Sequence, residues 1–310
     1  MLLPGIIFIV GPTAVGKSDV AIVLAQRIQG EIISCDSMQV YREIHIASNK
    51  PSGDELKSVP HHLIDIISVR DEFDVARFNQ LALTHIKAIH SRQRVPIVVG
   101  GSGMYVQILL DGIFEGRGKD PELRQALVRQ AHELGPDVLY EKLKRMDPQA
   151  AARTHPNDLK RIIRALEIVL TENKSVSELH KERKGLWGQY PIDIFGLNLD
   201  RKELYKKIEA RVDHMFQVGA VEEVRALQNM SLSKTAECII GVKEIRGYLN
   251  GAYAEGEARD LMKLHTRRLA KRQLTWFRKD KRVFWLMLDS PETPRRVAER
   301  ILEQLQIREG

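Results

Sequence analysis

Short apolar runs alternate with helical patterns along the first part of the chain. Residues 6–10 read Ile-Ile-Phe-Ile-Val, and residues 32–35 and 95–99 are similarly rich in Ile and Val. Runs of this length and composition are typical of strands that are buried on both faces of a sheet. An Ala- and Leu-rich helical pattern over residues 17–28 follows the first run. Strands that alternate with helices in this way predict an open parallel sheet, whose ligands bind at the carboxyl ends of the strands.

The pattern changes over residues 115–189, where helix-forming and charged residues dominate and four prolines cap or break the expected helices. Strand character returns at residues 191–199, and helices are expected from about residue 201 to residue 282. A short strand at 283–286 and an amphipathic helix over about 293–306 complete the pattern. The sequence therefore predicts three parts: a core domain at 1–114, an all-helical insert at 115–189 and a return to the core at 190–310.

Composition narrows the class of protein. The 310-residue chain is 43% hydrophobic and 29% charged, which is typical of a soluble globular protein and argues against a disordered or fibrous one. No apolar run approaches the roughly 20 residues that cross a bilayer, and the first residues lack the pattern of a secretory signal. We therefore expect a cytoplasmic monomer without membrane contact. Two cysteines, Cys35 and Cys238, are too few for a disulfide framework or a four-ligand zinc site.

Positive charge is concentrated near the carboxyl end. The formal net charge is +7, and residues 259–282 contain ten Lys or Arg against two Asp. Such an excess favours contact with a polyanion. We expect Trp276 and Phe277, which lie in the same segment, to anchor the core and not to stack on bases. Four of the cations form pairs four residues apart and predict a basic stripe along an RNA backbone, namely Arg267 with Lys271 and Arg268 with Arg272.

A phosphate-binding loop follows the first predicted strand. Residues 11–18 read Gly-Pro-Thr-Ala-Val-Gly-Lys-Ser and match G-x-x-x-x-G-K-[ST] in full, with a strand before and a helix after. Backbone N–H groups and the helix N-terminus surround phosphate oxygens in such a loop, Lys17 adds a full charge, and Ser18 is placed to ligate Mg²⁺. The predicted diphosphate-binding residues are Gly11, Pro12, Thr13, Ala14, Val15, Gly16, Lys17 and Ser18.

The acid that phosphoryl transfer commonly needs is missing from its usual place. The strand predicted at 95–99 ends in Gly100-Gly101-Ser102 and not in a carboxylate. The candidate acid is Asp36, which follows the second predicted strand and is therefore expected beside the phosphate loop. A helix cap or turn residue is the alternative interpretation of Asp36. These features predict the fold class as α/β, a P-loop NTPase-like parallel sheet flanked by helices, with an all-helical insert domain.

Six segments occur in this order along the chain: Gly11 to Ser18, Asp36 to Tyr41, Val59 to Asp65, Gly100 to Tyr105, Arg161 with Arg164 to Glu167, and Ala270 to Phe277. Through these segments the chain resembles the bacterial tRNA dimethylallyltransferases, also called tRNA isopentenyltransferases, over nearly its whole length. The resemblance implies transfer of a dimethylallyl group from dimethylallyl diphosphate to the exocyclic N6 amine of the adenosine immediately 3′ of the anticodon, with release of diphosphate. It implies a tRNA anticodon stem-loop and dimethylallyl diphosphate as partners and Mg²⁺ as cofactor.

The resemblance assigns roles near the reacting atoms. Negative charge accumulates on the departing diphosphate as the allylic carbon–oxygen bond breaks, where Lys17, the loop amides and Mg²⁺ would stabilise it. An exocyclic adenine amine is a poor nucleophile because its lone pair is delocalised, so Asp36 is the expected base. Ser102 stands where the family usually has Thr, and an ordinary turn serine is the alternative. Arg211 matches a family arginine near the reaction centre, and a lone surface arginine is the alternative. The expected catalytic residues are Lys17, Asp36, Ser102 and Arg211.

The resemblance also implies tRNA contacts. The family's base-reading segment maps onto residues 36–39, and the target adenine should leave its stack to reach them. In the insert, Arg161 and Arg164 lie three apart on a helix predicted over 158–170, where a solvated charged face is the alternative. The family contacts tRNA with this stretch, which here is 160–164. The expected tRNA-binding residues are Asp36, Ser37, Met38, Gln39, Ser102, Arg124, Lys160, Arg161, Ile162, Ile163, Arg164, Arg268 and Arg272.

Some positions depart from the family pattern, and two other functions remain open. Residues 41–51 differ from the usual family sequence, which puts any role of the departing positions in doubt. A small-molecule kinase is favoured by the phosphate loop but opposed by the missing acid and the basic segment. A non-catalytic RNA-binding P-loop protein leaves Asp36 without a role. The departures are His45, Ala47, Ser48, Asn49, Arg77 and Val242.

Overall fold

The computed structural model describes residues 5–114, 120–289 and 291–309 of the chain. Within these ranges the chain forms a six-stranded sheet in the order β3-β2-β4-β1-β5-β6, and every neighbouring pair is parallel. The fold class predicted from the sequence, a P-loop-like parallel sheet flanked by helices, is confirmed. The strands are β1 (Ile6–Val10), β2 (Glu31–Ser34), β3 (His61–His62), β4 (Pro96–Gly100), β5 (Ile192–Asn198) and β6 (Phe284–Met287).

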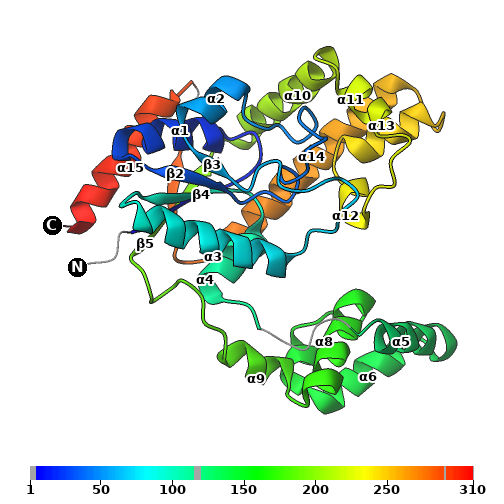
Figure 1. Ribbon diagram of the computed structural model, residues 1–310. Coiled ribbons are helices and arrows are strands. Elements are labelled where there is room, and N and C mark those ends of the chain that lie inside the picture. Colours follow the sequence, from blue (N-terminus) through cyan, green and yellow to red (C-terminus); the bar gives the residue numbers. More distant parts are fainter. Residues whose placement is uncertain (1–4, 115–119, 290, 310) are drawn as a thin grey trace. The chain divides into compact units, whose positions relative to one another are not determined.

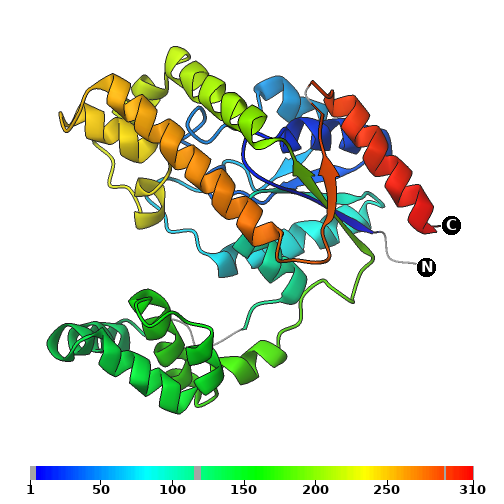
Figure 2. The same ribbon diagram turned by 180° about the vertical axis from the view of Figure 1, so that it is seen from behind.

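Helices cover both faces of the sheet, with α1 and α15 on one face and α3 and α4 on the other (Figure 1). Figure 2 shows α10 and the long helix α14 side by side, at the end of the sheet where α1 begins. The helices of this unit are α1 (Lys17–Ile28), α2 (Gly53–Ser58), α3 (Val75–Ser91), α4 (Gly103–Asp111), α10 (Arg201–Gln217), α11 (Ala220–Ala226), α12 (Lys234–Glu237), α13 (Val242–Leu249), α14 (Glu255–Phe277) and α15 (Pro294–Glu309).

The described chain divides into two compact units. One contains the residues up to Leu110 and those from Trp187 onward, and the other runs from Asp111 to Leu186. The sequence predicted an insert at 115–189. The second unit is helical throughout its described elements, which are α5 (Pro121–Leu134), α6 (Pro136–Met146), α7 (Pro148–Ala152), α8 (Leu159–Glu172) and α9 (Val176–Lys181).

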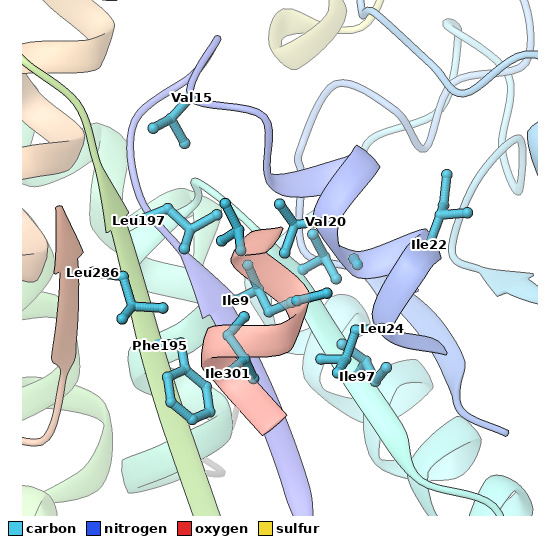
Figure 3. Close-up of a cluster of buried hydrophobic side chains, with 14 of the residues drawn as sticks. Ile9, Val15, Val20, Ile22, Leu24, Ile97, Phe195, Leu197, Leu286 and Ile301 are labelled. Atoms are coloured by element: carbon cyan, nitrogen blue, oxygen red, sulfur yellow. The ribbon is translucent and has the colours of Figure 1, made fainter. Parts of the chain in front are cut away.

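The main hydrophobic core fills the space between the sheet and helices α1 and α15. Ile9 of β1, Leu24 of α1 and Ile301 of α15 are fully buried there, and Figure 3 shows them with Ile97 and Phe195 of the neighbouring strands. All five residues of β1 are buried, which agrees with the unbroken apolar run that predicted a central strand. This packing fixes the carboxyl ends of β1 and β4 and therefore the loops that follow them.

The insert has its own core. Leu139 and Leu143 of α6 pack with Ile162 and Leu166 of α8, and all four side chains are fully buried. Prolines open α5, α6 and α7 at their first helical positions, as the sequence predicted for capping prolines. No helix among the described residues is both long enough and apolar enough to span a bilayer.

Candidate active site

A cleft of about 400 Å³ opens at the carboxyl ends of the central strands. This is the edge of the sheet where ligands of open α/β folds bind, and the volume lies in the range of small-molecule sites. The phosphate loop forms one wall of the cleft. Asp36, Met38, Gln39 and residues 47–49 form another, and side chains of α10 and α14 complete it. The predicted phosphate site and the predicted acid therefore share one cleft.

Two glycines explain the backbone conformation of the phosphate loop. Gly16 takes a φ of 96°, and Gly11 approaches β5 so closely that a Cβ there would lie 2.4 Å from the carbonyl oxygen of Leu197. Only glycine fits such positions. The Nζ of Lys17 donates to the Pro12 carbonyl at 2.7 Å, which folds the side chain over the loop.

Lys17 is strongly perturbed by its surroundings. The pKa of Lys17 is lowered to about 8, chiefly by burial; the negative charge of Asp36 opposes the shift, and the positive charge of Arg211 adds to it. Lys17 also lines the cleft, so a bound anion meets a cation that little water screens. Such a cation is suited to a diphosphate because an anion would restore the interactions that burial removes.

Asp36 lies on the opposite wall. Its Oδ1 accepts a hydrogen bond from the main-chain N–H of Met38 at 2.8 Å, the contact of an ordinary turn aspartate. Burial raises the pKa of Asp36, and the Met38 N–H and the charges of Lys17 and Arg211 oppose that rise. The carboxylate thus makes the contact of a turn residue, but it is also an acid with a perturbed pKa near two cations. A turn alone does not require such surroundings.

Arg211 is not a lone surface residue. The guanidinium Nη2 donates to the Thr13 hydroxyl at 2.7 Å, which joins α10 to the phosphate loop across 198 positions of sequence. Burial lowers the pKa of Arg211 to about 10, against the charge of Asp36. Its Nε is buried without a hydrogen-bond partner among the described residues. Arg211 is therefore a second cation of the cleft with unused donor capacity.

Ser102 is connected to the turn that carries Asp36. Its Oγ accepts from the main-chain N–H of Ser37 at 3.3 Å, and its own N–H donates to the Cys35 carbonyl at 3.3 Å. The side chain is not among those that line the cleft. Ser102 therefore holds in place the turn that carries Asp36.

The side-chain amide of Gln39 makes hydrogen bonds to two different segments. The Ser34 hydroxyl donates to Oε1 of Gln39 at 2.8 Å, and Nε2 of Gln39 donates to the Asn49 carbonyl at 3.1 Å. Met38 and Gln39 line the cleft, whereas Ser37 does not. Two of the three residues after Asp36 in the expected base-reading segment therefore reach the cavity.

Sequence reasoning missed Gln273 of α14. Its Oε1 accepts the main-chain N–H of Thr13 at 2.8 Å, and its amide packs on Gly101, where a Cβ would lie 2.2 Å away. Gln273 therefore links the phosphate loop to the loop after β4. It lies within the segment 270–277 that carries the resemblance, but in the sequence only the cations of that segment indicated a binding role.

The cations of the insert differ in their exposure and in whether they are paired with an acid. Arg164 and Arg124 lie 2.9 and 3.4 Å from Oε2 of the fully buried Glu167, so both are already paired. Arg161 pairs with Asp158 at 3.2 Å but stays largely exposed, and Lys160 is exposed.

Two insert residues need a correction. Ile162 and Ile163 are 0% and 5% exposed, because their side chains fill the core of the insert. Direct contact of these two side chains with tRNA is therefore wrong for this structure. They orient α8 and, with it, the neighbouring Lys160 and Arg161.

The cations of α14 likewise differ in their exposure and pairing. Arg268, Lys271 and Arg272 are exposed, whereas Arg267 pairs with Glu209 at 2.6 Å. The stripe of four predicted cations is thus reduced to three that are exposed.

The two aromatic residues at the end of α14 behave differently. Phe277 is 2% exposed and anchors the core as predicted, but Trp276 is 41% exposed. The interpretation of Trp276 as a core anchor is wrong, because one face of its indole packs on Gly103 while the rest meets solvent. Trp276 lines a second hollow with Lys279 and Lys281.

The chain is similar to known proteins over most of its length. A model of the IPP transferase family matches residues 39–280. A tRNA dimethylallyltransferase of Alkaliphilus oremlandii is 44% identical over 301 residues, which cover 96% of either chain. One of Acetivibrio thermocellus is 39% identical over 302 residues, again 96% of either chain.

Solved structures give the same result. The full-length tRNA isopentenylpyrophosphate transferase of Bacillus halodurans is 38% identical with a TM-score of 0.71, covering 98% of this chain and 97% of that one. A eukaryotic dimethylallyltransferase whose structures describe it acting on tRNA is 31% identical with a TM-score of 0.80, covering 92% of this chain and 74% of that one.

Proposed function

Since the chain belongs to the IPP transferase family, we propose that it transfers a dimethylallyl group from dimethylallyl diphosphate to tRNA. The acceptor is the exocyclic N6 amine of the adenosine immediately 3′ of the anticodon. The bond from N6 to the allylic carbon forms, the bond from that carbon to the diphosphate oxygen breaks, and the amine gives up one proton. The observation that carries this proposal is the perturbed acid Asp36 in the same cleft as the phosphate loop.

The phosphate loop holds the leaving group. Lys17 and Arg211 place two positive charges on the cleft, and the loop amides add oriented dipoles. Negative charge grows on the diphosphate as the allylic bond breaks, so these groups bind the transition state more tightly than the substrate. The loop thus serves alkyl transfer without phosphoryl transfer, which agrees with Gly100 at the end of β4 where an acid is common.

Asp36 takes the proton. Its Oδ1 accepts the Met38 N–H, and main-chain hydrogen bonds from Met38 and Gln39 orient the carboxylate, whose two oxygens have further acceptor sites for the N6 amine. The raised pKa of Asp36 makes it a better proton acceptor than an ordinary surface carboxylate. Ser102 positions this acid through Ser37, and Gln39 offers its amide to the base edge.

Magnesium fits this cleft only together with the diphosphate. The described residues contain no group of three or more His, Cys, Asp or Glu that could hold a metal ion. Mg²⁺ commonly binds one or two protein oxygens plus substrate phosphates and waters, and the Ser18 hydroxyl lines the cleft for that purpose. When bound there, the ion neutralises charge on the departing diphosphate.

Exposed cations supply the RNA contact. On α14 these are Arg268, Lys271 and Arg272, and on α8 they are Lys160 and Arg161. Each neutralises phosphate charge and adds salt-dependent affinity without sequence information. The target adenine then leaves its stack to enter the cleft.

The test is incubation of the protein with an anticodon stem-loop, dimethylallyl diphosphate and Mg²⁺. We expect the RNA to gain the mass of one dimethylallyl group. A parallel sample with ATP in place of the prenyl donor should leave the RNA unchanged. Consumption of ATP with phosphorylation of a small molecule, and no prenylated RNA, would contradict the proposal and favour a kinase.

A further inference from the structure

A loop that departs from the family pattern forms part of the cleft wall. Residues 44–50 lie between the segment after β2 and α2, and Ala47, Ser48 and Asn49 of this loop line the cleft. Ala47 and Met262 both pack closely on Gly241, where an added Cβ would lie 3.0 Å from an atom of each of them. Substitutions in this loop therefore act on the cavity itself.

One carboxylate holds the loop from outside. Oε2 of Glu223 on α11 accepts the main-chain N–H groups of His45 and Ile46, both at 2.7 Å, and Oε1 accepts that of Ala47 at 3.0 Å. Three consecutive N–H groups thus converge on a single anion. Hydrogen bonds to a carboxylate are shorter and stronger than those between neutral groups, so this contact fixes the backbone of 45–47.

The far end of the loop meets the segment expected to read the base. The Asn49 carbonyl accepts from Nε2 of Gln39 at 3.1 Å, and the Ser48 hydroxyl donates to the Ile44 carbonyl at 2.6 Å. Lys50 donates to the Tyr41 carbonyl and pairs with Asp65. These contacts fix the loop, which therefore holds the carbonyl oxygen of Asn49 at one position beside Gln39.

We infer that Glu223 is a positioning residue, which acts through residues 45–49 to set the amide of Gln39 for the target adenine. The inference rests on the proposed function, because Gln39 has an adenine to orient only if tRNA is the substrate. It also explains how His45 and Ala47 can vary from the family pattern. The anion grips main-chain N–H groups, which every residue except proline provides.

Kinetics of Glu223→Gln are the first test, with the neighbouring exposed Glu222→Gln as the matched control of equal charge change. We expect kcat to fall about tenfold, the change that follows from losing roughly 1.4 kcal/mol of transition-state orientation. The KM for dimethylallyl diphosphate should stay within about twofold, because Lys17 and Arg211 hold that substrate. Loss of diphosphate affinity in place of kcat would overturn the inference.

A double-mutant cycle tests the route through Gln39. If Glu223 acts through this amide, Glu223→Gln should change kcat by less than about twofold in a Gln39→Ala background. An undiminished tenfold loss there would show that Glu223 acts elsewhere and would overturn the inference. If Glu223→Gln does not fold, Glu223→Asp replaces it, since it keeps the charge and shortens the reach.

Hydrogen exchange separates this inference from the proposed function. The amides of residues 45–47 should exchange faster in Glu223→Gln than in the wild type or Glu222→Gln, whatever reaction the protein catalyses. Unchanged exchange would refute the hold of Glu223 on the loop. Faster exchange together with a wild type that prenylates no RNA would instead refute the proposed function, and the role of Glu223 in adenine positioning with it.

Discussion

Two enclosed carboxylates, one in each unit, show how differently the chain treats an acid. Glu167 of the insert is fully buried, and its oxygens pair with Arg164 and Arg124 and accept the Asp120 N–H at 3.1 Å. Asp36 of the core accepts the Met38 N–H, and burial leaves its pKa raised. An acid whose partners are all supplied by the protein has a structural role. An acid in a cleft whose pKa stays raised despite two nearby cations is available to a substrate.

Removing the charge of Asp36 should have the largest effect. Asp36→Asn keeps the shape of the side chain but cannot take a proton, so we expect kcat to fall roughly 10²–10⁴-fold. The affinity for tRNA, measured by filter binding, should change little because phosphate contacts dominate it. A variant with near-normal kcat would remove Asp36 from the chemistry.

The same change at Glu167 should affect stability in place of catalysis. Glu167→Gln weakens the anchor of two guanidinium groups and one buried N–H, and we expect a loss of roughly 1–3 kcal/mol in the free energy of unfolding. Both guanidinium groups are partly exposed and water screens them, so the lower half of that range is expected. Urea denaturation measures it, with the exposed Glu133→Gln as control.

A fall in kcat as large as that of Asp36→Asn would contradict the structural role of Glu167. The comparison would then fail, because both acids would belong to the reaction.

The pH dependence of kcat/KM for dimethylallyl diphosphate should show the perturbed cation of the cleft. The pKa of Lys17 is about 8, so the free enzyme loses this charge as pH rises through 8, and kcat/KM should fall about tenfold per pH unit above it. On the acid side, kcat/KM should fall at a pH above the ordinary pKa of a carboxyl group, because the pKa of Asp36 is raised and activity needs Asp36 ionised.

Lys17→Arg is the control for that assignment. An arginine stays charged through this range, so the alkaline limb should move to higher pH. A limb that stays near pH 8 in this variant would assign the titration to another group.

The smallest effects are expected on α14. Arg268→Ala and Arg272→Ala should each raise the KM for tRNA a few-fold and reduce the slope of log KM against log salt by about 1. Arg267→Ala is the matched control, because its guanidinium is already paired with Glu209 and should leave the salt slope unchanged. Equal slopes for all three variants would show that the exposed stripe does not contact phosphates.

Features that depend on neighbouring residues could be predicted from the sequence. The β1 strand follows from five consecutive apolar residues, and the phosphate loop follows from the spacing of Gly11, Gly16 and Lys17. The periodicity of α8 already predicted that Ile162 is buried, because a helix with one apolar face packs that face against a core. Its expected tRNA contact came from the resemblance and ignored this periodicity.

Contacts between distant segments could not be predicted in this way. The hydrogen bond from Thr13 to Gln273 spans 260 positions, and that from Ala47 to Glu223 spans 176. No local pattern specifies such a pair, since the topology of the sheet and the packing of α11 and α14 bring the partners together. Arg211 was proposed only through the resemblance for the same reason. Its bond to Thr13 depends on where α10 runs.

Diphosphate release from paired stem-loops tests the central claim most directly. One stem-loop carries adenosine immediately 3′ of the anticodon, and the other carries inosine, which lacks the exocyclic amine. We predict one diphosphate released per prenylated RNA with adenosine and none above background with inosine. Equal release with both RNAs, or release without RNA modification, would contradict a cleft in which Asp36 prepares an adenine amine beside the leaving group.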